Sequence, residues 1–247
     1  MKDDHEFLIW FAGELAALPA VEAVALGGSR ALGQNRPDSD WDFGIYYRTR
    51  FDPTDLRAKG WDGTISEIGD WGGGVMNGGA WLLIGDRRVD VHYRDLTEVE
   101  HWCAEAEHGR FDKELLLFYV AGIPTYVVMA ELALHQVLVG DLPRPSYPEP
   151  LADEAARRWK ADAIASLSYG QAAMRSRGDV VVALANASRA LVEASHGLLA
   201  EAKQWVLNEK GIVVRAGLDE EASMLLAASD RTELALAMDR IQSRFMA

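Results

Sequence analysis

The pattern of apolar and polar positions divides the chain into a mixed N-terminal part and a helical C-terminal part. Residues 4–18 carry apolar side chains at helical spacing and end at Pro19, which predicts a helix. Residues 21–27 and 41–47 are short runs of apolar, aromatic and β-branched side chains, which predict two strands joined through a glycine turn. Residues 81–96 predict a hairpin that turns at a Gly-Asp pair. These elements together predict a small sheet.

From Leu96 onward, nearly every segment shows helical periodicity. Residues 141–150 contain four of the eight prolines of the chain, which is typical of a linker or a rigid crossing. Residues 151–247 are rich in Ala and Leu and contain no proline, which indicates an antiparallel helix bundle. We therefore predict an α+β chain in which residues 1–140 form a small mixed sheet flanked by helices. Residues 151–247 then form an all-α domain, predicted to be the other wall of a cleft.

Composition narrows the class of protein. The net charge of −13 disfavours a protein that wraps nucleic acid, because such binding needs clustered Lys and Arg. It favours a cationic acceptor molecule, and a divalent cation would still let an anionic substrate bind. Cys103 is the only cysteine, so no internal disulfide forms and a reducing compartment is expected. The first residues are acidic and no apolar run reaches 18 residues, so we predict a cytoplasmic protein with no membrane partner.

Two aspartates stand where the second predicted strand begins. Asp40 and Asp42 flank Trp41, so both carboxylates point to one face of the strand and Trp41 points to the other. They lie about 7 Å apart along the backbone, and unpaired carboxylates at this distance repel each other near a core. A shared cation removes this repulsion, and Mg²⁺ commonly takes one or two carboxylates together with water and phosphate oxygens. The pair predicts a magnesium site.

A glycine turn precedes the two aspartates by about ten residues. Gly27 and Gly28 allow backbone N–H groups to approach an anion, and Ser29 adds a hydroxyl. Arg30 provides a positive charge for the same phosphate groups, or is a solvated residue at the start of a helix. A phosphate-binding turn followed by two carboxylates predicts a site for a metal-bound nucleotide.

A third acid, Asp90, lies on the predicted strand RRVDVHY, where Val89 and Val91 face the opposite way. In a site with two metal ions, such an acid bridges the cations or takes the proton of the attacking hydroxyl. The alternative for Asp90 is a strand-end ion pair with Arg87 or Arg88.

The stretches GGSRALG and SDWDFGIYY resemble the nucleotidyltransferase superfamily of DNA polymerase beta. The hallmark of that superfamily is a Gly-Ser pair, a loop, an Asp-x-Asp pair and a third acid on a later strand. The chain is similar to the bacterial minimal and antibiotic-modifying types, which combine this sheet with a C-terminal helical domain. The motif resemblance covers residues 21–95. It implies an adenylyltransferase that binds ATP or another nucleoside triphosphate with Mg²⁺ at Gly28, Ser29, Asp40, Asp42 and Asp90.

The same resemblance suggests two further residues and an acceptor. Lys210, in the segment WVLNEKG, would reach the triphosphate across the cleft, or is simply a cation at a helix end. Glu131 is a candidate for an acid that acts as the base from the other side, although nothing in its spacing demands this and a solvated helix face explains it better. The implied acceptor is a hydroxylated small molecule of the aminoglycoside or lincosamide type, which would make the protein an antibiotic-resistance enzyme. A partner protein modified by an antitoxin-like enzyme, and a non-catalytic nucleotide-binding homologue, remain the alternatives.

Overall fold

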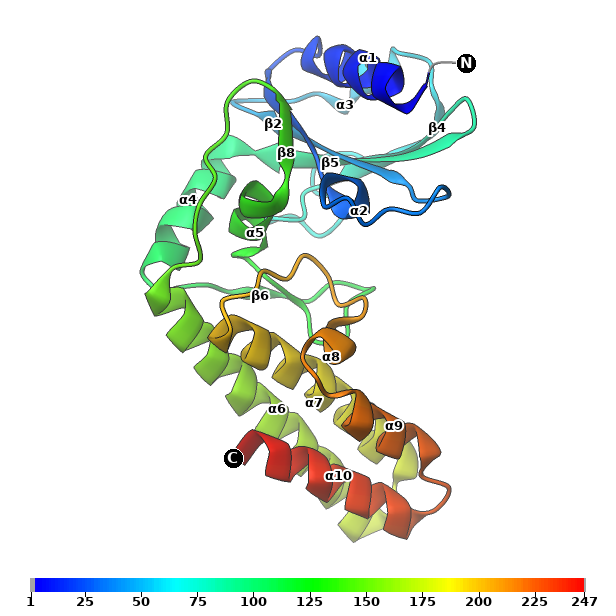
Figure 1. Ribbon diagram of the computed structural model, residues 1–247, viewed down its shortest axis with the longest axis vertical. Helices are drawn as coiled ribbons and strands as arrows, with labels where there is room; N and C mark the ends of the chain where they lie inside the picture. Colours follow the sequence, from blue (N-terminus) through cyan, green and yellow to red (C-terminus); the bar gives the residue numbers. More distant parts are fainter. Residues whose placement is uncertain (1–2, 247) are drawn as a thin grey trace. The chain divides into compact units, whose positions relative to one another are not determined.

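A computed structural model describes residues 3–246 of the chain, which form two compact units (Figure 1). The first unit consists of the chain up to residue 105 together with residues 125–146. The second unit consists of residues 106–124 and the chain from residue 147 onward. The chain therefore passes from one unit to the other three times.

The first unit is built on a six-stranded mixed sheet with the order β3-β4-β5-β2-β1-β8. Among the strand pairs of this sheet, the central pair β2 and β5 is parallel and the other pairs are antiparallel. The pairing sets Asp42 of β2 directly opposite Asp90 of β5. The strands are β1 (Val21–Leu26), β2 (Trp41–Tyr47), β3 (Asp62–Ile65), β4 (Gly79–Ile84), β5 (Arg87–Asp95) and β8 (Gln136–Val139).

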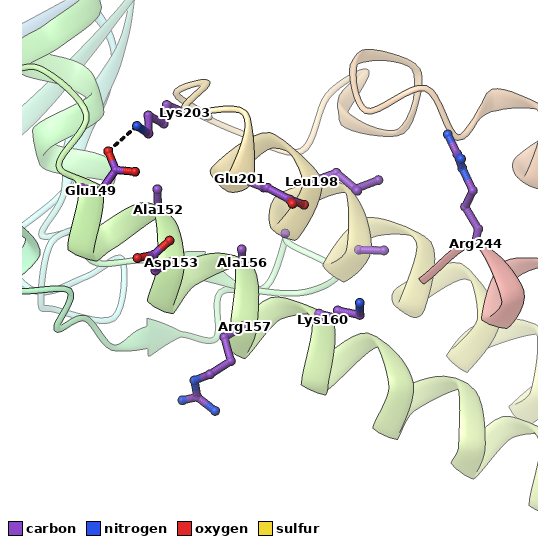
Figure 2. Close-up of a pocket in the computed structure, with 12 residues that line it drawn as sticks. Glu149, Ala152, Asp153, Ala156, Arg157, Lys160, Leu198, Glu201, Lys203 and Arg244 are labelled. Carbon is purple, nitrogen blue, oxygen red and sulfur yellow. Dashed lines mark hydrogen bonds and ion pairs between the residues drawn. The ribbon is translucent and has the colours of Figure 1, made fainter. Parts of the chain in front are cut away.

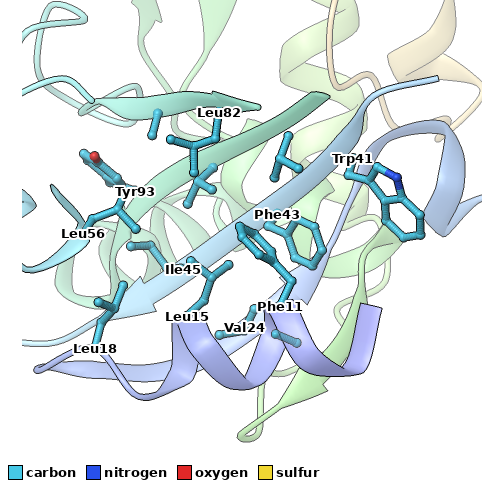
Figure 3. Close-up of a cluster of buried hydrophobic side chains, with 14 of the residues drawn as sticks. Phe11, Leu15, Leu18, Val24, Trp41, Phe43, Ile45, Leu56, Leu82 and Tyr93 are labelled. Carbon is cyan, nitrogen blue, oxygen red and sulfur yellow. The ribbon is translucent and has the colours of Figure 1, made fainter. Parts of the chain in front are cut away.

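One face of this sheet is apolar and is covered by helix α1. The odd-numbered side chains of β2 and β5 pack against Phe7, Phe11 and Leu15 of α1 in one core cluster (Figure 3). Burying each of these large side chains contributes about 2 kcal/mol. The even-numbered side chains of the same strands therefore face the opposite side, and these include Asp42 and Asp90. The helices of this unit are α1 (Asp4–Ala16), α2 (Gly28–Ala31), α3 (Pro53–Arg57), α4 (Leu96–Glu107, which continues into the second unit) and α5 (Val127–Leu134).

A capping box fixes the beginning of α1. Asp3 accepts a hydrogen bond from the backbone N–H of Glu6 at 2.8 Å, and the Glu6 carboxylate accepts one from the N–H of Asp3 at 3.3 Å. The two bonds satisfy N–H groups that have no partner within the helix. They anchor the helix whose aromatic residues cover the apolar face of the sheet.

The second unit is dominated by a pair of long helices, α6 and α7. The left-handed Gly178 (φ 64°) ends α6, and the side chain of Asp179 then caps α7 by accepting from the N–H of Val182. Buried alanines on both helices leave room for close packing, and Leu167, Leu191 and Met238 fill the remaining space. The elements of this unit are β6 (Lys113–Glu114), β7 (Ile123–Pro124), α6 (Glu149–Arg177), α7 (Val180–Glu201), α8 (Ile212–Arg215), α9 (Asp219–Ala227) and α10 (Arg231–Met246).

The predicted mixed α/β fold class is confirmed, as are the helix over 4–18, the strands over 21–27 and 41–47 and the hairpin at Gly85. The prediction of helix throughout the chain after Leu96 is wrong in two places. Residues 113–124 form a small two-stranded sheet with a loop, and residues 136–139 form the edge strand β8. The run QVLV is too short for its periodicity to distinguish helix from strand, and its pairing with β1 decides the outcome.

Candidate active site

The glycine turn lies directly against Asp42 of strand β2. Gly28 has a left-handed backbone (φ 61°), and a Cβ atom added there would overlap the carboxylate of Asp42. The backbone N–H of Gly27 also donates to the carbonyl oxygen of Asp42 at 2.7 Å. Only glycine fits at position 28, both for its backbone and for this approach. Within residues 3–246 the hydroxyl of Ser29 forms no hydrogen bond with another residue, so it is available to a ligand of the turn.

Asp42 and Asp90 form the acidic pair of this face. They occupy opposite positions on the adjacent parallel strands β2 and β5, which lie about 4.8 Å apart. Both side chains are partly exposed. Two carboxylates at this spacing are a donor set that suits one Mg²⁺, with water and phosphate oxygens completing its shell. Within residues 3–246, however, no three Asp, Glu, His or Cys side chains gather closely enough to form a ready-made metal site.

Asp40 lies on the same face, one strand repeat before Asp42, but its carboxylate is engaged. Arg88 forms an ion pair with Asp40 and also donates to the carbonyl oxygen of Asp38 at 2.8 Å. The side chains of Asp40 and Arg88 are 43% and 65% exposed, so this pair is held in solvent and exchanges readily. A metal ion that took Asp40 as a third ligand would have to displace Arg88.

Arg30 stabilises the loop that carries Asp40 through hydrogen bonds to its backbone. Its guanidinium donates to the carbonyl oxygen of Ser39 at 2.9 Å and to that of Asp40 at 3.2 Å, and it lies 4.0 Å above the ring of Trp41. The side chain is only 10% exposed. These contacts favour a role in positioning the loop, and the predicted contact of Arg30 with phosphate stays a prediction.

Glu131 belongs to the first unit and is buried on α5, where Arg94 of β5 binds both of its oxygens. Arg94 Nε donates to Oε2 at 2.6 Å and Nη2 donates to Oε1 at 2.5 Å. Burial alone would raise the pKa of Glu131, but the charge and hydrogen bonds of Arg94 outweigh burial and lower that pKa to about 2. A carboxylate with so low a pKa and with both oxygens occupied is a weak proton acceptor. The contacts of Glu131 favour a structural role.

Lys210 lies in the second unit, in the turn before α8, and is exposed. Its backbone N–H donates to the side chain of Asn208 at 2.9 Å. The neighbouring Glu209 accepts from the backbone N–H groups of Val120 and Ala121 at 2.6 and 2.8 Å. The Asn-Glu-Lys segment thus holds the loop of residues 115–122, and the predicted contact of Lys210 with a triphosphate remains a prediction.

The second unit also contains a pocket of about 410 Å³ between α6 and α7 (Figure 2). Its walls carry acidic and basic side chains in nearly equal number, and Lys203 forms an ion pair with Glu149 across its rim. The volume is within the range of small-molecule sites. None of the residues that the sequence predicts for the site lines it.

Three residues behind the acidic pair were not among the sequence-predicted site residues. Tyr46 of β2, Arg94 of β5 and His135 at the end of α5 form a polar layer on the same face as Asp42, together with Glu131. The alternation of Asp90, His92 and Arg94 along β5 was a signal for such a polar face. The partners of that face come from a distant helix, and nothing local in the sequence identified them.

Residues 8–71 match the family described as "Nucleotidyltransferase domain". The matched segment contains the glycine turn and the Asp-x-Asp pair, and the match indicates nucleotidyltransferase activity. No curated protein matches the chain in sequence. Among solved structures, the chain is similar to a nucleotidyltransferase-like protein from Exiguobacterium sibiricum 255-15, with a TM-score of 0.49 and 13% identity over 96% of this chain and 72% of that one. No helix in the described part of the chain is long and apolar enough to span a membrane.

Proposed function

We propose that the chain is a magnesium-dependent nucleotidyltransferase that moves adenosine monophosphate from ATP to a hydroxyl group of a small-molecule acceptor and releases pyrophosphate. The observation that carries this proposal is the approach of Gly28 to Asp42, with Asp90 opposite on the next strand. A turn with partly exposed polar groups then borders a pair of carboxylates, as the binding of a metal-bound triphosphate requires.

In this mechanism each side chain has a defined task. Asp42 and Asp90 would hold the magnesium ion, and Asp40 would join them on leaving Arg88. Magnesium, when bound, would neutralise negative charge on the phosphate oxygens. Gly28 and Ser29 orient the β- and γ-phosphates, so that the α-phosphorus is open to in-line attack.

Proton transfer falls to Asp90, because Glu131 is held by Arg94. The Asp90 carboxylate takes the proton of the acceptor hydroxyl while the oxygen of that hydroxyl bonds to the α-phosphorus. The bond between the α-phosphorus and the bridging oxygen breaks, and pyrophosphate leaves with the electron pair. The products are the adenylylated acceptor and pyrophosphate.

The charge of the chain favours a cationic acceptor. The net charge of −13 attracts molecules that carry amino groups, such as aminoglycoside-like or lincosamide-like antibiotics. The helical unit offers surface and a pocket of small-molecule size for binding such a molecule.

A protein is the second candidate for the acceptor, and one surface favours it. The loop of residues 115–120 exposes four apolar side chains, namely Leu115 (77% exposed), Leu117 (90%), Phe118 (84%) and Val120 (52%). Contiguous apolar side chains at this level of exposure are typical of surfaces that bind other macromolecules.

The test uses the full-length protein, Mg²⁺, ATP labelled at the α-phosphate and a panel of aminoglycosides and lincosamides. We expect pyrophosphate release and a labelled acceptor with at least one class. The variant Asp42→Asn should lose this activity and its magnesium-dependent ATP binding, because it removes a metal ligand. Asp62→Asn, on the exposed end of β3, is the matched control and should behave as the wild type.

Two results would contradict the proposal. One is a wild-type protein whose melting temperature does not respond to any nucleoside triphosphate with magnesium, since ligand binding to the folded state must raise it. The other is an Asp42→Asn variant that retains full activity. Label that appears only on protein in a cell extract would instead favour the second candidate acceptor.

A further inference from the structure

The two glycines of the turn face two different side chains. Gly28 borders the carboxylate of Asp42, whereas Gly27 borders the ring of His135. A Cβ atom added at Gly27 would lie 2.7 Å from His135 Nε2 and 3.0 Å from Cε1. The backbone of Gly27 (φ −116°, ψ −160°) is extended and open to any residue, so the neighbouring ring is the reason that position 27 needs a glycine.

One hydrogen bond to its ring and one to its backbone hold His135 behind Gly27. The Tyr46 hydroxyl lies 3.4 Å from Nδ1 of His135, and the backbone N–H of His135 donates to the carbonyl oxygen of Glu131 at 2.8 Å. Glu131 is in turn fixed by its two bonds with Arg94. Every member of this series lies in the first unit.

The His135 imidazole and the Tyr46 phenol are both neutral, which is compatible with a hydrogen bond between them. Burial lowers the pKa of His135 below its usual value, against the opposing effect of the Glu131 carboxylate, so the imidazole is neutral at pH 7. Burial also raises the pKa of the Tyr46 phenol, which therefore keeps its proton. With both groups neutral, the 3.4 Å contact holds one shared proton, donated either by the Tyr46 hydroxyl or by Nδ1 of His135.

We propose that His135 is a positioning residue of the nucleotide site, whose ring packs behind Gly27 and holds the turn against Asp42. The inference rests on the proposed function, because it assigns the turn to the triphosphate. The N–H of Gly27 donates to the carbonyl of Asp42, so a shift of Gly27 moves the turn relative to the carboxylate. Displacements of about 1 Å are enough to lower the efficiency of a catalytic site strongly.

The first test is a double-mutant cycle on the melting temperature of the full-length protein. Gly27→Ala should lower it by several degrees, because the new methyl group meets the His135 ring. His135→Ala removes the ring that the new methyl group meets. The double variant should therefore recover at least half of the melting temperature that Gly27→Ala loses. Gly13→Ala on α1 is the matched control, since a Cβ atom there meets nothing within 4 Å, and it should not lower the melting temperature.

The second test measures ATP binding by isothermal titration in the presence of magnesium, together with steady-state kinetics. His135→Ala should weaken binding and raise the KM for ATP about tenfold, because the turn loses its support. Tyr46→Phe, which removes only the hydroxyl, should give a smaller change in the same direction. His101→Ala, an exposed histidine on α4, should match the wild type.

The outcomes separate this inference from the function on which it rests. Additive effects of Gly27→Ala and His135→Ala, or a His135→Ala variant that binds ATP as tightly as the wild type, would overturn the inference and leave the proposed function standing. A wild-type protein that binds no triphosphate would remove the proposed function and the nucleotide role of His135 with it. The double-mutant cycle would then still report whether His135 packs behind Gly27.

Discussion

Replacing Glu131 with glutamine removes the carboxylate that binds the buried guanidinium of Arg94 in the first unit. Arg94 is 1% exposed and Glu131 is 9% exposed, so water cannot replace the lost carboxylate. The guanidinium would keep its bond to the carbonyl oxygen of Tyr93 at 3.0 Å but would lose one charged partner. An unpaired buried charge is far more costly than the loss of one hydrogen bond.

The size of the effect follows from the pKa of Glu131. Burial raises this pKa, but the interaction with Arg94 outweighs burial and lowers it from 4.5 to about 2. Each tenfold change in acid dissociation is worth about 1.4 kcal/mol, so the ionised carboxylate contributes about 3 kcal/mol to the free energy of unfolding at pH 7. Because the folded pKa is below the unfolded one, the contribution is complete above about pH 4.5 and is lost as the pH falls toward 2.

Guanidinium titrations of the full-length protein measure this contribution. We expect Glu131→Gln to lower the free energy of unfolding by about 3 kcal/mol at pH 7, and by much less at pH 3. The control is Glu100→Gln, since Glu100 binds Arg48 through both oxygens as well, but at the surface. That exposed pair is screened by solvent, so Glu100→Gln is expected to change the free energy of unfolding far less than Glu131→Gln. Equal stability of Glu131→Gln and the wild type at pH 7, or the same gap at both pH values, would refute the reasoning.

Three further substitutions test other parts of the structure. Gly28→Ala should abolish ATP binding measured by isothermal titration, because its methyl group would overlap the Asp42 carboxylate on a left-handed backbone. Arg30→Lys should increase proteolytic cleavage of the loop over 33–40 and lower the melting temperature by a few degrees, since a lysine cannot reproduce both carbonyl bonds. His196→Phe should stabilise the protein by about 2 kcal/mol at pH 5 relative to the wild type. Burial lowers the pKa of His196 to about 3, so wild-type stability is lost as the pH falls from 6.5 toward 3, and the phenylalanine removes this loss. Unchanged binding in the first, an unchanged cleavage rate in the second, or parallel pH profiles in the third would contradict these expectations.

The elements predicted correctly are those whose signals are local. The strand over 41–47 alternates aromatic and other side chains between two faces, and the spacing of Gly28, Asp42 and Asp90 is visible within one part of the chain. Strand β8 was missed, because a run of four residues, three of them apolar, carries no distinct period and its strand state depends on β1, more than a hundred residues earlier.

The polar layer behind the acidic pair could not be predicted for the same reason. The bond between Tyr46 and His135 joins residues 89 positions apart, and the pair of Arg94 and Glu131 spans 37 positions. Glu131 is a candidate base on sequence alone because an acid on a helix fits many roles. The contact with Arg94, which disfavours this role because it makes the carboxylate a weak proton acceptor, is not visible in the sequence.

The chain crosses between the two units three times, and this affects the order in which the first unit folds during synthesis and the choice of truncated fragments. Strand β8 and helix α5, which complete the first unit, leave the ribosome only after residues 106–124, which belong to the second. The His135 ring, which lies against Gly27, is therefore synthesised after residues 106–124, and the first unit cannot finish folding from its first hundred residues alone. A fragment cut at residue 146 would carry residues 106–124 without the helices that they join, exposing their apolar side chains. Such a fragment is expected to aggregate, whereas one in which a short linker replaces residues 106–124 is the rational choice for isolating the first unit.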